Sequence, residues 1–210
     1  MANSIEIKTL FLDIGGVLLT NGWDRNARRR AVAKFNLDYD EINERHHLTF
    51  DTYEHGKLDL DEYLKRVIFY EERTFTPEKF KEFMFSQTRA FPDMINFVRG
   101  LKSHYNLKTL VVSNEGRELN EFRINKFKLD EIIDAFVSSS FVHYRKPDKD
   151  IFHIALDISQ TEPRQVVYLD DRRMFVEIAR EIGIIAIHHE KFEKTKKALS
   201  ELGLILPGNE

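Results

Sequence analysis

Polar side chains close three short apolar runs of the chain, one of them within FLDIGGVLL at residues 11–19. In chain order these side chains are Asp13, Ser113 with Asn114, and Asp170 with Asp171. Neighbouring carboxylates repel one another, so a cation is expected among the three acids, and ligands that are all oxygen suit Mg²⁺. A carboxylate held against phosphorus can act as a nucleophile. If these residues meet, they predict phosphoryl chemistry.

Lys146 adds a positive charge to this set. It stands just before Pro147 and the start of a predicted helix. An ammonium group, a serine hydroxyl and loop amides at a strand end suit a phosphate group, and the cations would neutralise phosphoryl oxygens. We therefore expect a small phosphorylated ligand in a crevice that these residues share.

The elements that must position these residues follow from hydrophobic patterning. Runs of β-branched and aromatic residues predict buried strands over 7–14, 107–114, 165–171 and 184–189, with a weaker candidate at 133–140. Apolar residues at three- and four-residue steps predict helices over 92–105, 148–159 and 173–183. Such alternation is typical of an α/β fold, here a Rossmann-like doubly wound parallel sheet. Ligands bind at the carboxyl ends of its strands, where the polar residues should converge.

The segment 20–88 breaks this alternation. It contains no convincing strand and has several helical patterns rich in charged and aromatic residues. We predict an inserted small α-helical cap over 20–88 and an α/β core formed by 1–19 and 89–210.

Composition excludes several classes of function. The 210 residues carry a formal net charge of −3 and contain no cysteine. We therefore expect no nucleic-acid partner, no disulfide framework and no thiolate metal site. The first ten residues lack the pattern of a secretory leader, and no apolar run is long enough to span a bilayer. The expectation is a cytoplasmic protein without a membrane partner, and the pattern specifies no oligomeric state.

Four motifs in a fixed order give the chain a resemblance to a known family. They are FLDIGGVLL, LVVSNEG, YRKPDKDIF and VVYLDDRRMF. Together they resemble the haloacid dehalogenase-like (HAD) superfamily, and the insert lies where the helical-cap phosphatases of that superfamily place their cap. The resemblance implies an Mg²⁺-dependent phosphatase that works through an aspartyl-phosphate intermediate.

The resemblance also implies a role for each matching residue. Asp13 matches the nucleophile and a metal ligand. Ser113, with the backbone of Asn114, matches the phosphate-binding position, and Lys146 matches the lysine that stabilises phosphoryl charge. Three further residues match the metal-binding positions. Gly15 would bind through its backbone carbonyl, Asp171 as a direct ligand, and Asp170 directly or through water.

Gly15 departs from the pattern, because most phosphatases that the chain resembles carry a second Asp there. That Asp protonates the leaving group and then activates water, a contribution of roughly 10²- to 10⁴-fold in rate. Its absence favours substrates with good leaving groups, such as acyl, aryl or sugar 1-phosphates. It also motivates an alternative, a catalytically impaired regulatory protein that binds phosphate and metal. A dehalogenase fits less well, since it needs no metal and the acidic pair at 170 and 171 would have no use there. A phospho-receiver domain also fits less well, since it carries its acidic pair on the first strand, whereas here the pair comes last and a helical segment intervenes.

Two further groups of residues allow either a structural or a functional interpretation. One of the insert histidines, His46, His47 or His55, could replace the missing acid, although surface or core positions fit all three better. His188 and His189 follow the last predicted strand and are expected to be structural. The remaining group is Trp23, Arg25 and the arginines at 28–30, which either contact an anionic substrate or form a solvated helix face.

Overall fold

A computed structural model describes residues 6–207, and within them five strands form one parallel sheet. The strands lie in the order β3-β2-β1-β4-β5, and their bounds are β1 Thr9–Leu12, β2 Lys108–Ser113, β3 Ala135–Ser138, β4 Val166–Asp170 and β5 Ile185–His188. Each predicted run contains one strand, so the α/β doubly wound fold is confirmed. The expectation about a leader rests partly on residues 1–5, which lie outside the described residues.

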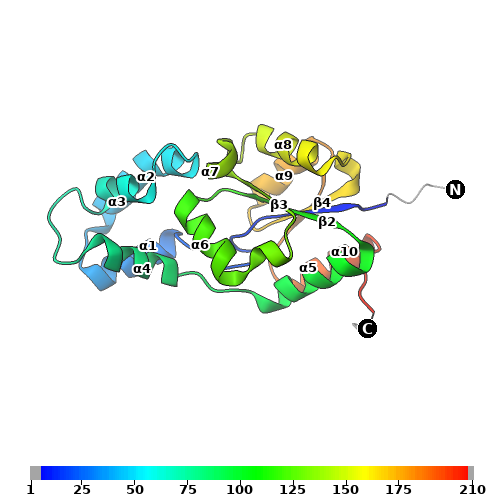
Figure 1. Cartoon of the computed structure of the whole chain (residues 1–210), viewed down its shortest axis with the longest axis horizontal. Helices are drawn as coiled ribbons and strands as arrows, with labels where there is room; N and C mark the ends of the chain where they lie inside the picture. The colour runs from blue at the N-terminus through cyan, green and yellow to red at the C-terminus, as the bar shows by residue number, and fades with distance from the viewer. Residues whose placement is uncertain (1–5, 208–210) are drawn as a thin grey trace.

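The central strand β1 divides the core into two apolar layers, because successive side chains of a strand point to opposite faces. Leu10 and Leu12 lie in the cluster shared with α5 (Pro92–Tyr105) and α10 (Phe192–Glu201). Phe11 lies in the opposite cluster, with α8 (Asp150–Ser159) and α9 (Arg173–Glu181). Figure 1 shows α8 and α9 above the sheet and α5 and α10 below it. The sheet is therefore covered on both faces.

Two helices of this core are absent from the sequence-based expectation. One is α6 (Arg117–Phe127), whose buried positions include Asn120 and Arg123, so its inner face carries no clean apolar stripe. The other is α10, in which Thr195 takes a buried position that an apolar residue usually fills. Short helical turns complete the connections at Leu129–Glu131, Ser139–Val142 (α7) and Pro163–Gln165.

Four helices occupy the segment 20–88, which we call the helical unit. They are α1 (Arg25–Phe35), α2 (Tyr39–Glu54), α3 (Leu60–Val67) and α4 (Pro77–Ser86). Each begins at a residue whose side chain accepts hydrogen bonds from the first backbone amides, namely Asp24, Asp38, Asp59 and Thr76. The unit has its own apolar cluster, to which α6 contributes Leu119 and the partly buried Phe122.

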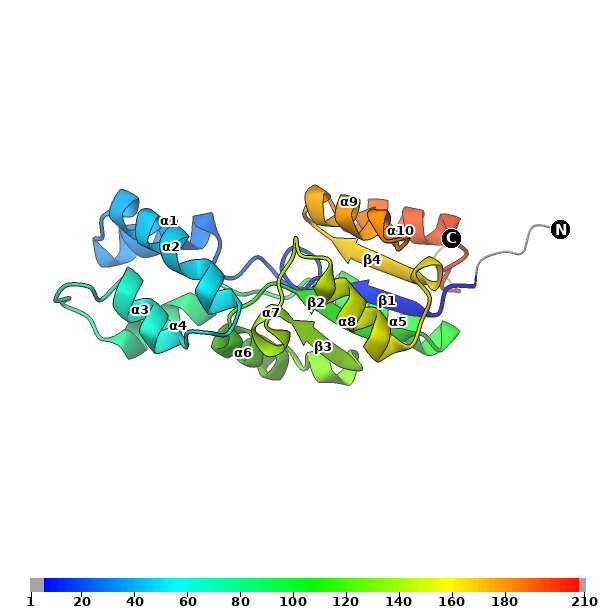
Figure 2. The same cartoon turned by 90° about the horizontal axis from the view of Figure 1, so that it is seen from above.

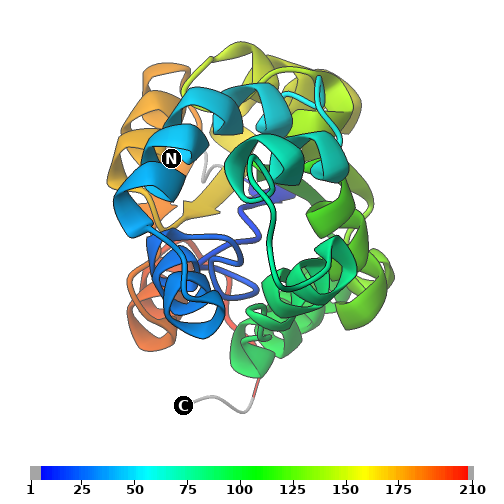
Figure 3. The same ribbon diagram turned by 90° about the vertical axis from the view of Figure 1, so that its left-hand side faces the viewer.

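The helical unit stands at the carboxyl end of the sheet. It extends from the core in Figure 2, and in Figure 3 its blue, cyan and blue-green helices lie in front of the strands. The two connecting segments pair with each other, since Thr20 N donates to Arg89 O at 2.8 Å and Phe91 N donates to Leu18 O at 2.9 Å. No described helix has the length and apolarity needed to cross a membrane.

The packing of the helical unit predicts a large cost for removing Phe80. This side chain is fully buried and contacts the indole of Trp23 edge-on, with ring centroids 5.6 Å apart. We expect Phe80→Ala to lower the free energy of unfolding by about 3–5 kcal/mol, as cavity-forming changes do. Denaturant titration followed by the fluorescence of Trp23, the only tryptophan in the chain, measures it.

Leu48→Ala is the matched control, because Leu48 lies on α2 of the same unit and is 78% exposed. A surface change of this kind costs less than about 0.5 kcal/mol. Equal destabilisation by the two variants would contradict the packing described here.

Candidate active site

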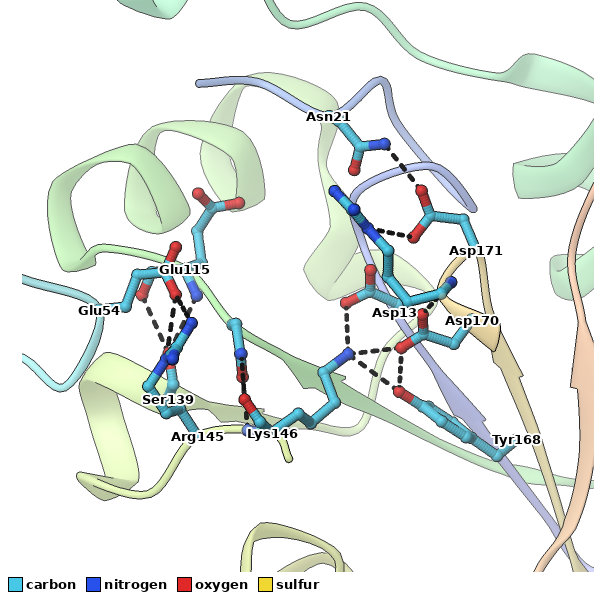
Figure 4. A network of polar contacts seen from close by, with 12 residues as sticks. Asp13, Asn21, Glu54, Glu115, Ser139, Arg145, Lys146, Tyr168, Asp170 and Asp171 are labelled. Carbon is cyan, nitrogen blue, oxygen red and sulfur yellow. Dashed lines mark hydrogen bonds and ion pairs between the residues drawn. The ribbon is translucent and has the colours of Figure 1, made fainter. Parts of the chain in front are cut away.

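The polar residues predicted to converge meet at the carboxyl edge of the sheet. Asp13 directly follows β1, and Asp170 is the last residue of the neighbouring strand β4. Ser113 is the last residue of β2, on the other side of β1. Lys146 reaches the same place from the loop before α8, as Figure 4 shows. Strand order therefore brings together residues far apart in the sequence.

The ammonium group of Lys146 is the centre of the polar network. Its Nζ lies 3.0 Å from Asp13 Oδ1, 2.6 Å from Asp170 Oδ2 and 2.9 Å from the hydroxyl of Tyr168, which it contacts as a donor. The lysine side chain is 1% exposed and Asp170 is fully buried. Tyr168 also donates to Asp170. The two carboxylates offset the cost of burying the lysine charge, and together they raise its pKa against the opposing effect of burial.

Asn114 fixes the loop that carries Lys146. Its side-chain amide donates to the backbone oxygen of Lys146 at 2.8 Å, and its Oδ1 accepts from the backbone N–H of Lys146 at 2.8 Å. The residue whose backbone is predicted at the phosphate site therefore uses its side chain to hold the backbone of Lys146. Asn114 directly follows Ser113, whose side chain is buried.

Three carboxylates lie close enough to share a cation. Oxygens of Asp13, Asp170 and Asp171 all lie within 4.8 Å of one another. Asp171 Oδ2 accepts a hydrogen bond from Asn21 at 2.8 Å, whereas its Oδ1 is buried and accepts none within residues 6–207. The only cation within ion-pair distance of this oxygen among residues 6–207 is the exposed Arg172, whose Nε lies 3.7 Å away. A buried carboxylate oxygen without a hydrogen bond, beside two further acids, fits a hard divalent cation such as Mg²⁺.

The same crowding perturbs the nucleophile candidate. Burial raises the pKa of Asp13 from 3.8 to about 7; Lys146 opposes this rise, and the charges of Asp170 and Asp171 add to it. A hydrogen bond with Ser113 lowers the pKa of Asp13, as Lys146 does. A carboxyl with so high a pKa becomes ionised at neutral pH most readily when a further positive charge is near.

The glycine pair after Asp13 lets two polar side chains approach the turn. At Gly16, where φ is +75°, a Cβ would lie 2.3 Å from Asp171 Oδ2. At Gly15 a Cβ would lie 2.5 Å from Asn21 Oδ1. Asn21 therefore occupies the space in which a side chain at position 15 would begin, and it bonds Asp171 from there.

A cavity of about 960 Å³ extends from this edge of the sheet to the helical unit. Its floor includes Asp13, Ser113 and Lys146, and its far wall includes Trp23 and Tyr63 of the helical unit. The cavity joins the site to the segment predicted as a cap.

The histidines of the helical unit differ in their surroundings. The ring of His46 is buried and its Nδ1 lies 2.8 Å from the hydroxyl of Tyr63; burial lowers the pKa of His46 to about 3, so the ring is neutral. His47 lines the cavity, whereas His55 pairs with the backbone oxygen of Asp51. His46 also lines the cavity. A neutral His46 cannot serve as a proton donor in the way an imidazolium does, which leaves His47 as the candidate of the two.

The two histidines after the last strand also separate. His189 Nδ1 pairs with Thr195 Oγ1 at 2.8 Å, a contact within the core. His188 Nε2 lies 3.0 Å from the backbone oxygen of Asp171 and lines the cavity, so it is closer to the acidic cluster than the sequence indicates.

Two ion pairs at the site have no signal in the sequence. Arg145 Nη2 lies 2.6 Å from Glu54 Oε2, which joins the loop of Lys146 to α2 of the helical unit. Arg123 pairs with Glu115, which directly follows Asn114, and burial raises the pKa of Glu115 to about 7 despite that pairing. Both carboxylates line the cavity.

The raised pKa of Asp13 makes stability depend on pH. Between pH 4 and pH 7 the folded chain binds a proton at Asp13 that the unfolded chain releases, so stability falls as pH rises. Relative to Asp13→Asn, the wild type should lose on the order of 3 kcal/mol across this window when a chelator removes metal ions. Urea unfolding of both proteins at several pH values measures the difference, and a difference that does not change with pH would contradict the assignment.

Comparison with known proteins places this chain in a family. A family model described as haloacid dehalogenase-like hydrolase matches residues 7–183. A D-ribitol-5-phosphate phosphatase of Bacteroides thetaiotaomicron is 26% identical over 188 residues, which cover 84% of this chain and 89% of that protein.

Solved structures agree with the fold. A HAD family enzyme from Bacteroides thetaiotaomicron, crystallised with magnesium and inorganic phosphate, superposes with a TM-score of 0.73 at 19% identity over 90% of this chain and 98% of that one. A HAD-like family hydrolase from Porphyromonas gingivalis gives a TM-score of 0.75 at 18% identity, over 93% of this chain and 97% of that one. With its sheet, its ordered motifs and the family match over residues 7–183, the chain belongs to the haloacid dehalogenase-like hydrolases.

Proposed function

We propose that this hydrolase is an Mg²⁺-dependent phosphatase of a small phosphorylated metabolite. The observation that carries the proposal is the acidic cluster of Asp13, Asp170 and Asp171, in which one buried oxygen accepts no hydrogen bond from the described residues, at the floor of a cavity. Lys146 lies within the cluster and provides a cation for a phosphoryl group. The solved relative that binds magnesium and inorganic phosphate supports this reading.

In this proposal each residue of the floor has a role. Asp13 and Asp171, the backbone carbonyl of Gly15 and, directly or through water, Asp170 hold Mg²⁺. The bound ion supplies positive charge that lowers the pKa of Asp13 and neutralises phosphoryl oxygens. Lys146 contributes a second positive charge.

The reaction proceeds in two displacements. The ionised carboxylate of Asp13 attacks phosphorus, and the bond from phosphorus to the ester oxygen breaks as the leaving group departs. Ser113 donates a hydrogen bond to the phosphoryl group, and Lys146 stabilises its charge. Water then attacks the phosphorus of the aspartyl phosphate, which releases inorganic phosphate and regenerates Asp13.

Substrate choice depends on the helical unit and on Gly15. The helical unit forms one wall of the cavity and is proposed to act as the cap over 20–88. The relative named D-ribitol-5-phosphate phosphatase makes a sugar or polyol phosphate a reasonable substrate class. Because position 15 has no carboxyl group, esters with good leaving groups are expected to react fastest.

The lack of an acid at position 15 also favours a second candidate, a regulatory protein that keeps phosphate on Asp13. Asn21 occupies the space that an acidic side chain would need. A slow or absent hydrolysis of the aspartyl phosphate would support this second function.

Phosphate release from a panel of aryl, acyl, sugar 1-phosphate and alkyl esters tests the proposal. We expect Mg²⁺-dependent release that is greatest for the better leaving groups and is abolished in Asp13→Asn. Added EDTA should remove the activity, and excess Mg²⁺ should restore it. Glu6→Gln, an exposed change at the far end of β1, is the control. Release that persists in Asp13→Asn or with EDTA would contradict the mechanism.

The occupied space beside Gly15 yields a second prediction. Gly15→Asp alone should gain little, because its Cβ would meet Asn21 Oδ1. In Gly15→Asp/Asn21→Ala the new carboxyl has room, and alkyl ester hydrolysis should rise by up to about 10²-fold over Asn21→Ala. The kcat for one alkyl and one aryl ester measures the gain. An equal effect on both esters would argue against a missing general acid.

A further inference from the structure

Among the described residues, one cation of the helical unit is buried without an ion-pair partner. Arg28, in the first turn of α1, is 6% exposed and lines the same cavity as Asp13. Within residues 6–207 its hydrogen bonding is limited to Nη1, which donates to the backbone oxygen of Trp23 at 3.0 Å, and it takes part in no ion pair. Its Nε is buried without a partner. Arginine does not lose its charge in proteins, so burying it unpaired is unfavourable.

The polar groups packed nearby do not supply the missing charge. Trp23 Nε1 donates to the hydroxyl of Tyr63 at 2.9 Å, and that hydroxyl lies 2.8 Å from Nδ1 of the neutral His46. These three side chains therefore bond one another and carry no charge. Asp24 is the nearest acid in sequence, and its Oδ1 accepts from Ala27 N to cap α1. Burial lowers the pKa of Arg28; the charge of Asp24 opposes this effect but, within residues 6–207, forms no ion pair with the guanidinium group.

The other carboxylates of the cavity have their own cations. Glu54 pairs with Arg145, Glu115 pairs with Arg123 and Asp13 pairs with Lys146. Asp171 Oδ1 lies 3.7 Å from Arg172 Nε. Among the described residues, each of these acids is neutralised without Arg28. The positive charge of Arg28 is thus left for a ligand.

The neighbouring arginines do not share this placement. Arg29 is exposed and lies over the ring of Tyr39, with its guanidinium carbon 5.4 Å from the ring centroid. Arg30 is exposed and donates to Gln87 Oε1 at 2.7 Å. Of the three consecutive arginines, Arg28 alone lines the cavity.

We propose that Arg28 binds a second anionic group of the substrate, so that the substrates are phosphate esters that also carry a carboxylate or a second phosphate. The inference rests on the proposed phosphatase function. A guanidinium group matches both anions, because its fork of N–H donors contacts two oxygens at once. The phosphoryl group reacts at Asp13 while the second anion is held against α1, and the cavity of about 960 Å³ has room for both.

Three esters with the same five-carbon chain test the proposal: ribitol 5-phosphate, 5-phosphoribonate and ribitol 1,5-bisphosphate. At least one of the two doubly anionic esters should have a kcat/KM about 10- to 100-fold above that of ribitol 5-phosphate. If 5-phosphoribonate has the higher kcat/KM, the second anion is a carboxylate. If ribitol 1,5-bisphosphate has the higher kcat/KM, it is a phosphate. A kcat/KM for ribitol 5-phosphate that equals or exceeds both would overturn the proposal.

Arg28→Met and Arg29→Met form a matched pair of variants. Arg28→Met should bring the ratio of doubly anionic to singly anionic kcat/KM close to one, chiefly through a higher KM. Arg29→Met should keep the wild-type ratio. Removing an unpaired buried charge should leave the thermal unfolding midpoint of Arg28→Met at or above that of the wild type. A wild-type ratio in Arg28→Met, or the same loss in both variants, would contradict the assignment.

Two further measurements distinguish failure of the Arg28 site from failure of the proposed phosphatase function. Release of phosphate from 4-nitrophenyl phosphate, which has no second anion, reports the reaction at Asp13 whatever Arg28 binds. If no ester is hydrolysed, calorimetry with 5-phosphoribonate and ribitol 1,5-bisphosphate compares Asp13→Asn with Asp13→Asn/Arg28→Met. Binding at least about 10-fold weaker in the double variant for one of these ligands supports the Arg28 site, and equal binding of both overturns it.

Discussion

The site depends on one buried ammonium group. Parallel strands that end side by side bring Asp13 and Asp170 together, and such carboxylates repel each other once water is excluded. Lys146 Nζ, 3.0 Å from one and 2.6 Å from the other, makes their burial tolerable. Removing the lysine would leave two acids facing each other, a far larger penalty than the loss of a surface ion pair.

The lysine in turn depends on its surroundings for its position. Asn114 holds its backbone from β2, and Tyr168 reaches its ammonium group from β4. The contacts with Asn114 fix the backbone of Lys146, and another rotamer of its side chain would break the buried hydrogen bond to Tyr168. The ends of the three neighbouring strands β2, β1 and β4 thereby fix the positions of Lys146, Asp13 and Asp170. Asp171 adds the third acid of the cluster.

A second buried cation links the core to the helical unit. Arg123 of α6 donates through Nη2 to the backbone oxygen of Thr20 at 2.5 Å and through Nε to Thr88 Oγ1 at 3.3 Å, so it contacts both connecting segments. It also pairs with Glu115, next to the predicted phosphate-binding residues. One guanidinium group therefore contacts both connecting segments and a carboxylate that lines the cavity.

Sequence reasoning predicted the convergence of the acids, since it follows from where parallel strands end. It missed Tyr168, because a tyrosine within an apolar run is typical of a strand core and gives no sign of its hydroxyl's partner. The pairing of Arg145 with Glu54 spans 91 residues and depends on how α2 docks, which no local pattern encodes. Separating Arg28 from Arg29 and Arg30 likewise required knowing which side of α1 faces the cavity.

The central claim is that Asp13 attacks phosphorus. Its most direct test is acid quenching during turnover of an aryl phosphate with Mg²⁺, followed by mass mapping of the peptides. The account predicts one phosphoryl group on Asp13, formed at least as fast as phosphate is released and absent from Asp13→Asn. Turnover at the full rate with Asp13 unmodified at every quench time would contradict it.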